Sequence, residues 1–266
     1  MDRIKKLSEK KRIVIKVGSS TLSFPNGRIN LQRIESLATV LARIHKDNVE
    51  VILVTSGAVA VGGGILGIDK KPSNLSEKQA LAAIGQAELI KIYQKFFKEY
   101  DQVVAQVLLT KDGILNPVRR DNAANTLNAL LNMNILPIIN ENDTVSIRGI
   151  EFGNNDALSA SVAVLIKADL LIMLSDTDGL YSTDPKKARN AKLIPTVTEI
   201  SPGLEKSARG SKTSFGTGGM ATKIDAVKIC FEAGIDIILA NGREPEIIYD
   251  LIKGKEIGTY FVSSKT

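Results

Sequence analysis

The 266-residue sequence has no tryptophan, one cysteine and one histidine, and aromatic residues make up only 5% of it. A lone cysteine, Cys230, cannot form an intrachain disulfide, and a lone histidine, His45, cannot build a histidine-rich metal site. Cys230 falls in a helical pattern and is predicted to be a small core residue. His45, at the polar end of a helix, is predicted to lie on the surface. These absences argue against disulfide-stapled folds, histidine-rich metal sites and cysteine–histidine nucleophile pairs.

The sequence also lacks signals for membranes and for nucleic acid. No apolar run reaches the roughly 18 residues needed to span a bilayer. The basic N-terminus MDRIKKLSEKK is not followed by the apolar segment and cleavage site of a secretion signal, so we expect a cytoplasmic protein without membrane contact. The net charge of +6 favours anionic small molecules. Because the charges are scattered and few aromatic residues accompany them, nucleic acid is not an expected partner.

Composition and patterning favour a single large α/β domain over residues 1–266. Hydrophobic residues make up 44% and charged residues 24%, which is ordinary for a globular chain. Short, almost wholly apolar runs such as VEVILVT and DLLIMLS need cover on both faces, so the fold class is a three-layer αβα sandwich with a mainly parallel central sheet. Asn30 and Ser76 are predicted to cap two of the helices. Strands are predicted at 12–17, 49–55, 102–109, 135–139, 169–175, 235–240 and 257–262.

The stretch IVIKVGSS at residues 13–20 is an apolar strand that contains a lysine, Lys16, near its end and runs into a small, flexible loop. Open α/β sheets bind ligands at the carboxyl ends of their strands, and a cation beside exposed N–H groups suits phosphate. The competing interpretation is a strand whose lysine merely reaches solvent. The segment TSGA at 55–58 repeats the arrangement, because the N–H groups at the start of the following helix face whatever lies above the strand.

Three further motifs bear on phosphate or metal binding. The segment GTGGMATK at 216–223 brings glycines, a helix start and a lysine together without the order of a P-loop, and a flexible linker is the alternative. The run DTDG at 176–179 lacks the spacing of an EF-hand, so calcium is discounted. One set of glycines formally fits G-x-G-x-x-G but lies too far from the preceding strand, and the match is interpreted as accidental; it comprises Gly62, Gly64 and Gly67.

Carboxylates and amides gather in the loops that follow the strand ILPIIN. Asp143 lies just after this strand, and Asn155 and Asp156 open the helix ALSASVAVLI. A capping and turn network is the alternative explanation, since Asn and Asp are the usual residues for that task. The density of the cluster favours a ligand: Asp143 and Asn155 suit a bound ammonium and carboxylate, and Asp156 could hold lysines in place.

Six segments in this order resemble the amino acid kinase family: IVIKVGSS, VTSGAV, LPIINENDTV, FGNNDALSA, SDTDGLYSTDP and GTGGMATK. The resemblance covers about residues 11–262. It implies ATP-dependent phosphorylation of the γ-carboxylate of L-glutamate, giving L-glutamyl 5-phosphate and ADP in the first step of proline biosynthesis. The alternatives are a family member that acts on aspartate, acetylglutamate or UMP, and a non-catalytic nucleotide-sensing regulator on the same fold.

The resemblance also implies roles for residues at matching positions. Lys16 and Lys223 would be catalytic contacts to the ATP phosphates, and Asp156 would orient them. Substrate binding would fall to Ser56, Asp143 and Asn155. No residue is assigned as a metal ligand, because Mg²⁺ usually rides on the nucleotide with several waters. The residues expected to bind ATP are Lys16, Ser175, Asp176, Thr217, Gly218, Gly219, Met220, Ala221, Thr222 and Lys223.

The sequence departs from the family pattern in two places. The family loop usually reads FGDND, and Asn154 replaces its first aspartate, which removes a negative charge near the glutamate site. Many relatives carry a C-terminal PUA domain, which is not expected here because the sequence ends at Thr266. The resemblance further implies a substrate-binding part at about 1–165 and a nucleotide-binding part at about 166–262. It implies a homodimer or homotetramer, feedback inhibition by proline and functional coupling to glutamyl phosphate reductase.

Overall fold

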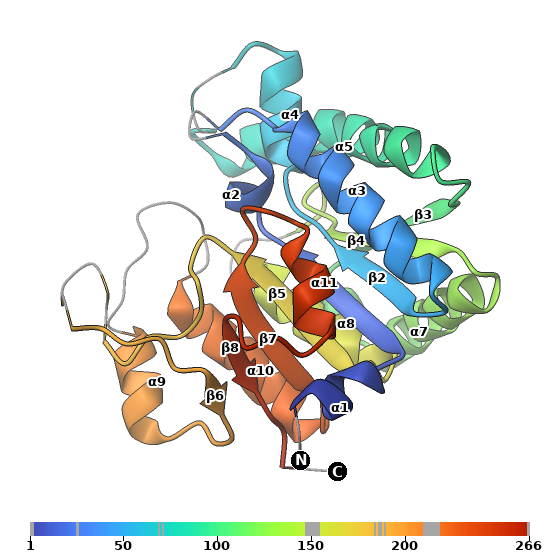
Figure 1. Ribbon diagram of the computed structural model, residues 1–266. Helices are drawn as coiled ribbons and strands as arrows, with labels where there is room; N and C mark the ends of the chain where they lie inside the picture. Colours follow the sequence, from blue (N-terminus) through green and yellow to red (C-terminus); the bar gives the residue numbers. More distant parts are fainter. Residues whose placement is uncertain are drawn as a thin grey trace.

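The computed structural model describes residues 3–24, 27–68, 70, 72–146, 155–183, 185, 188, 190–209 and 219–264. In this part of the chain, eight strands form one sheet in the order β3-β4-β2-β1-β5-β7-β8-β6 (Figure 1). Neighbouring strands run parallel except for the antiparallel pair β7 and β8. The predicted mainly parallel sheet is therefore confirmed.

All seven predicted strands are present, with ends shifted by at most two residues. The two-residue strand β6 was not predicted, since two residues are too few to show a period-2 pattern. The strands are β1 Arg12–Val17, β2 Glu50–Val54, β3 Val104–Leu109, β4 Leu136–Glu141, β5 Leu170–Ser175, β6 Thr196–Val197, β7 Asp236–Asn241 and β8 Thr259–Phe261.

Two predicted helix caps have different outcomes. Asn30 caps α3 as predicted, accepting a hydrogen bond from Arg33 N at 3.2 Å. The prediction of Ser76 is wrong: α5 begins two residues earlier, where Asn74 accepts from Glu77 N at 2.9 Å. The helices are α1 Arg3–Ser8, α2 Ser19–Leu22, α3 Leu31–Lys46, α4 Ala58–Ile65, α5 Leu75–Lys98, α6 Lys111–Leu115, α7 Pro117–Asn132, α8 Asn155–Leu165, α9 Pro202–Arg209, α10 Met220–Glu232 and α11 Ile247–Ile252.

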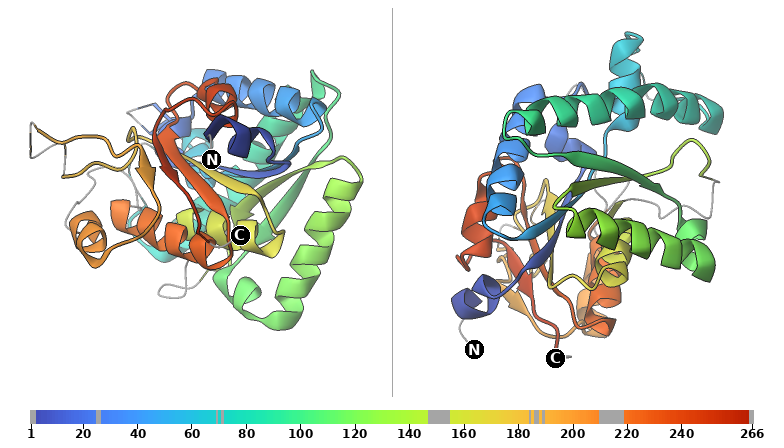
Figure 2. Two further views of the ribbon diagram at one scale, coloured as in Figure 1. Left: turned by 60° about the horizontal axis from the view of Figure 1, so that its bottom comes forward. Right: turned by 90° about the vertical axis from the view of Figure 1, so that its right-hand side faces the viewer.

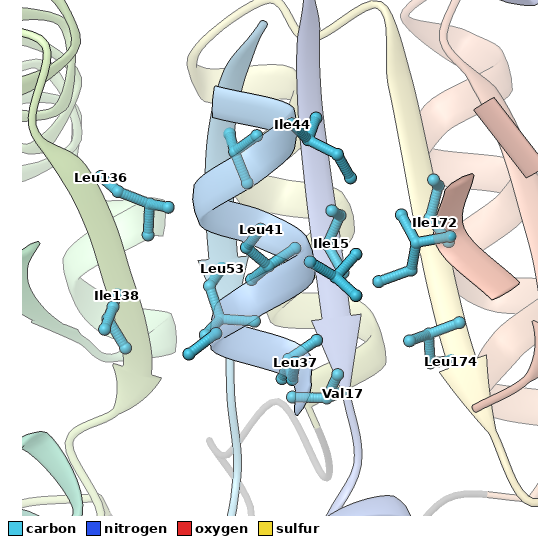
Figure 3. Packing of buried hydrophobic residues seen from close by; sticks show 14 of the residues in the cluster. Ile15, Val17, Leu37, Leu41, Ile44, Leu53, Leu136, Ile138, Ile172 and Leu174 are labelled. Carbon is cyan, nitrogen blue, oxygen red and sulfur yellow. The ribbon is translucent and has the colours of Figure 1, made fainter. Parts of the chain in front are cut away.

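Apolar residues on both faces of the sheet are covered by helices, which makes the predicted three layers. Alternate residues of β1 point to opposite faces, so Ile15 joins one core cluster and Val14 the other. The first cluster includes side chains from α3, α5 and α11, and Figure 3 shows Leu37 and Leu41 of α3 over this face. The second includes side chains from α7, α8 and α10. Figure 2 shows α5 and α7 on opposite sides of the sheet.

Strand β1 lies at the point where the chain changes direction across the sheet. It pairs with β2 on one side and with β5 on the other, both in parallel. The chain fills the β2 side first and returns to the β5 side only after β4. In open α/β sheets, ligands bind outside the carboxyl ends of the strands at such a switch point. By the alternation along β1, Lys16 lies on the same face as Val14, which is the face that α8 and α10 cover.

Helices α4 and α5 cross with their backbones in contact at two glycines. A Cβ atom on Gly62 would lie 2.0 Å from Leu81 O, and one on Gly85 would lie 1.8 Å from Ala58 O. Gly62 therefore lies inside a helix crossing and not in a strand-to-helix phosphate loop. This agrees with the interpretation that the glycine motif is accidental.

The predictions for the single cysteine and the single histidine have different outcomes. Cys230 is fully buried on α10, as predicted. The prediction that His45 lies on the surface is wrong, because the last turn of α3 packs against the segments that begin β2 and follow α7. His45 is 6% exposed, and its ring nitrogens lie 3.2 Å from Val49 O and 3.3 Å from Asn134 O. Among the described helices, none is long and apolar enough to cross a membrane.

Candidate active site

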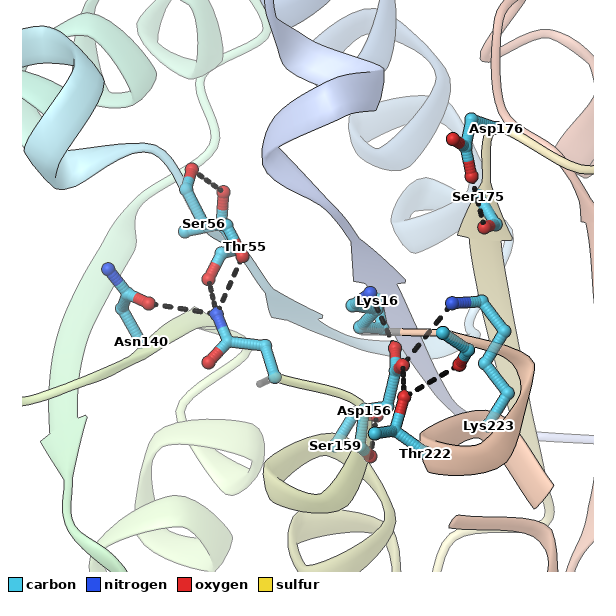
Figure 4. A network of polar contacts seen from close by, with 12 residues as sticks. Lys16, Thr55, Ser56, Asn140, Asp156, Ser159, Ser175, Asp176, Thr222 and Lys223 are labelled. Carbon is cyan, nitrogen blue, oxygen red and sulfur yellow. Dashed lines mark hydrogen bonds and ion pairs between the residues drawn. The ribbon is translucent and has the colours of Figure 1, made fainter. Parts of the chain in front are cut away.

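Two lysines from different elements meet at one buried carboxylate. Lys16 Nζ at the end of β1 lies 2.6 Å from Asp156 Oδ1, and Lys223 Nζ in the first turn of α10 lies 3.3 Å from Asp156 Oδ2 (Figure 4). Thr222 Oγ1 donates to Asp156 Oδ2 at 2.9 Å. Asp156 is 1% exposed and each lysine 6%. We call Lys16, Asp156 and Lys223 the ion triad.

The ion triad carries two positive charges against one negative charge. Burial by itself raises the pKa of Asp156, but the charges of Lys16 and Lys223 outweigh it and lower that pKa to about 2. Burial lowers the pKa of Lys223, Asp156 opposes this, and Lys16 adds to it. Because α8 and α10 both begin here, their free N–H groups add positive potential. The arrangement suits an anion of high charge.

A second group of polar side chains centres on Asn155, the neighbour of Asp156 in the first turn of α8. Its Nδ2 donates to Ser56 Oγ at 2.8 Å, to Asn140 Oδ1 at 3.0 Å and to Thr55 O. Every side-chain hydrogen bond of Asn155 with described residues uses Nδ2. Its Oδ1 can therefore accept from a ligand donor such as an ammonium group.

Asp143, the third predicted substrate residue, forms an ion pair with helix α5. Its carboxylate pairs with Lys78 of α5 at 3.0 Å and is 17% exposed. The structure thus brings two of the predicted substrate residues, Ser56 and Asn155, into direct contact, and ties Asp143 to α5. A ligand ammonium would have to compete with Lys78 for this carboxylate.

The predicted nucleotide residues begin at the end of β5, next to β1. Ser175 Oγ donates to Asp176 Oδ1 at 3.1 Å, and Asp176 is close enough to raise the pKa of Lys223. Gly219 caps α10, whose first turn contains Met220 and Ala221. Thr217, Gly218 and Asn154 lie outside the described residues.

Three residues of the site were not singled out from the sequence. Thr55 directly follows β2, and Asn140 lies near the end of β4. Because side chains alternate between the two faces along each strand, both residues point toward the face of the sheet that α5 covers. That alternation was the available signal. Lys78 had none, because only the fold brings the start of α5 to the loop after β4.

The donor set of the site suits a polyphosphate better than a bare metal ion. Within the described residues, no group of three or more His, Cys, Asp or Glu side chains could hold a metal ion. The ion triad instead offers two ammonium groups, and Thr222 beside it adds a hydroxyl. A divalent cation would reach such a site on the phosphates of a nucleotide.

A topological switch point with two lysines on one buried aspartate indicates a phosphate-handling α/β protein, and comparison with known families agrees. The family model described as the amino acid kinase family matches residues 11–241. The chain belongs to the amino acid kinase family.

Curated relatives and solved structures narrow the description. Glutamate 5-kinase of Clostridium perfringens is 51% identical over 265 residues, which cover 98% of each chain. Glutamate 5-kinase of Clostridium tetani is 49% identical over 259 residues, with 97% of each chain covered. The fold is similar to that of UMP kinase from Ureaplasma parvum, with a TM-score of 0.65 at 17% identity, covering 96% of this chain and 99% of that one. The fold is also similar to that of isopentenyl phosphate kinase from T. acidophilum, with a TM-score of 0.63 at 20% identity, covering 94% of this chain and 100% of that one.

Proposed function

We propose that the chain is a glutamate 5-kinase, which transfers the γ-phosphoryl group of ATP to the γ-carboxylate of L-glutamate and so begins proline biosynthesis. The observation that carries the proposal is the ion triad of Lys16, Asp156 and Lys223 beside the amide of Asn155. About half of the residues are identical to curated glutamate 5-kinases over nearly the whole chain, which supports this substrate over others in the family.

The chemistry needs positioning and positive charge more than acid–base catalysis. A carboxylate is already a competent nucleophile, so no general base is required, which fits a site without histidine. Lys16 and Lys223 would neutralise charge on the transferring phosphoryl group, and Asp156 would hold both ammonium groups in place. Bound Mg²⁺ would supply further charge neutralisation on the phosphates.

The acceptor half of the site would bind glutamate through Ser56, Asp143 and Asn155. Asn155 Oδ1 and the Asp143 carboxylate are the acceptors that an α-ammonium group needs, and the Ser56 hydroxyl can donate to a carboxylate. Glutamate would then enter from the side of β2 and β4, while Ser175 and Asp176 bind the nucleotide on the side of β5. This division supports a substrate part at about 1–165 and a nucleotide part at about 166–262.

The wider roles implied by the family belong to the same proposal. They are a homodimer or homotetramer in the cytoplasm, feedback inhibition by proline, and coupling to glutamyl phosphate reductase, which would consume the unstable acyl phosphate. Proline would bind at or near the glutamate site, since it carries the same ammonium and α-carboxylate groups.

Hydroxylamine trapping tests the reaction directly. Purified protein is supplied with MgATP and glutamate, aspartate, N-acetylglutamate or UMP, and both hydroxamate and ADP are measured. Hydroxamate from glutamate alone is the expected result. ADP release with a different acceptor would overturn the substrate but keep the kinase, and no turnover with any acceptor would favour a nucleotide-sensing regulator.

A further inference from the structure

Helix α5 presents a line of polar side chains to the acceptor half of the site. Gln79, Gln86 and Tyr93 are spaced seven residues apart, so they share one face of the helix. Gln79 Nε2 donates to Ser146 O at 3.2 Å, Gln86 Oε1 accepts from Asn140 Nδ2 at 2.8 Å, and Tyr93 Oη lies 2.8 Å from Thr55 Oγ1. Two of these contacts reach residues that bind the Asn155 amide.

The orientation of Asn140 follows from a backbone group. Glu141 N can only donate, and it lies 2.9 Å from Asn140 Oδ1. Nδ2 of Asn140 must therefore face the other way, toward Gln86, which has to present its oxygen. A flipped Asn140 would set its NH₂ group against the N–H of Glu141.

The orientation of the Asn155 amide follows in the same way. Thr55 O can only accept, so Nδ2 of Asn155 faces it and also reaches Asn140 Oδ1 at 3.0 Å. Asn140 is 4% exposed and Asn155 8%, so water is poorly placed to replace a lost partner of either amide. Thr55 O and Glu141 N thus set which way the two amides face, and Gln86, which accepts from Asn140 Nδ2, holds Asn140 Oδ1 where it meets Asn155 Nδ2.

We propose that Gln86 is a positioning residue for the acceptor, acting through Asn140 to hold Asn155 in the position that binds the amino acid. The inference rests on the proposed function, since it names what supports the glutamate half of that site. Among the described residues, Gln86 hydrogen-bonds to Asn140 and not to the ion triad, so it should affect acceptor binding and leave nucleotide binding alone.

Three variants test the role of Gln86. Gln86→Leu keeps the volume but removes the acceptor for Asn140 Nδ2, and Gln86→Glu keeps an acceptor oxygen at that point. Gln94→Leu is the matched control, because Gln94 is exposed on the same helix. Initial rates of hydroxamate formation give KM for glutamate and for ATP, and thermal unfolding is followed in parallel.

Loss of one hydrogen bond to a buried amide predicts that Gln86→Leu raises KM for glutamate about tenfold. KM for ATP should stay within a factor of about two, and Gln86→Glu should recover most of the affinity for glutamate, while Gln94→Leu behaves as wild type. Unchanged KM for glutamate in Gln86→Leu, or equal increases in KM for glutamate and ATP, would overturn this inference and leave the proposed function standing. Wild-type protein that gives no hydroxamate from glutamate would overturn the proposed function and this inference with it.

Discussion

Two ammonium groups share one carboxylate in the ion triad, and this decides what each residue can do. Asp156 uses Oδ1 for Lys16 and Oδ2 for Lys223, so each ammonium group is held by its own carboxylate oxygen inside a buried site. Their positions are therefore set before any ligand arrives. Charge that is already in place costs no reorganisation during phosphoryl transfer, which is where preorganised electrostatics contributes most.

Replacement of Lys223 tests this argument. Lys223→Ala should lower kcat about 10²-fold or more, because it removes a cation from the transferring phosphoryl group. Lys228→Ala is the control: Lys228 lies on the same helix but pairs with Glu205 at the surface, so its loss should leave kcat unchanged. Rates are measured by hydroxamate formation, with circular dichroism to check the fold. Near-normal turnover of Lys223→Ala would remove this residue from the mechanism.

At the scale of elements, helix α5 connects the acceptor site to the rest of the fold. Its N-terminal part crosses α4 at Gly62 and Gly85, and α4 begins two residues after Ser56. The crossing therefore controls where the loop after β2 lies. No side chain can occupy the crossing points without pushing the two backbones apart.

Gly85→Ala should show the cost of widening this crossing. An alanine in a helix normally gains about 1 kcal/mol over glycine, but here its Cβ would lie 1.8 Å from Ala58 O. We expect the free energy of unfolding to fall by about 2 kcal/mol and KM for glutamate to rise. Denaturant titration measures the first effect and hydroxamate kinetics the second.

Gly64→Ala supplies the comparison for Gly85→Ala. A Cβ on Gly64, also in α4, would meet nothing within 4 Å. This variant should be as stable as wild type or more stable by up to about 1 kcal/mol. Equal destabilisation of both variants would show that glycine at the crossing has no special role.

The sequence predicted elements whose signal is local, and missed features that arise from packing. Apolar runs predicted seven strands, and Lys16 was found because a lysine ending a buried strand is conspicuous. Gln86 and Tyr93 gave no signal, since polar residues on a long helix usually face solvent. His45 was placed at the surface for the same reason, although it contacts Asn134 O from another segment. Ser76 was predicted as the cap of α5 in place of Asn74 because both residue types cap helices well.

At the scale of the whole molecule, the two ends of the sheet have different tasks. The carboxyl ends of the strands carry the candidate site, whereas the amino end of β7 carries a buried aspartate that ties down the N-terminal segment. Asp236 is 1% exposed; Lys6 Nζ and Lys10 Nζ each lie 3.1 Å from its Oδ2, and Tyr260 Oη donates to it at 2.8 Å. These contacts join α1 to β7 and β8, away from the chemistry.

Asp236→Asn should therefore reduce stability without changing catalysis. Breaking ion pairs at a buried carboxylate with partly exposed partners should lower the free energy of unfolding by about 2 kcal/mol at pH 7. KM and kcat, measured well below the unfolding temperature, should match the wild type. Asp250→Asn removes the exposed pair with Lys255 and should change stability little. A kinetic defect in Asp236→Asn would show that the two ends of the sheet are coupled.

The pH dependence of this difference gives a further check with a definite sign. Burial raises the pKa of Asp236, but Lys10, the Tyr260 hydroxyl and other donors outweigh it, so the pKa lies below its ordinary value. A carboxyl group with a lowered pKa in the folded state adds stability above its ordinary pKa and loses that contribution as the pH falls. The stability gap between wild type and Asp236→Asn should thus be constant from pH 7 to 5 and shrink below about pH 4. A gap that widens in acid would contradict the assignment of Asp236 as the charged partner of both lysines.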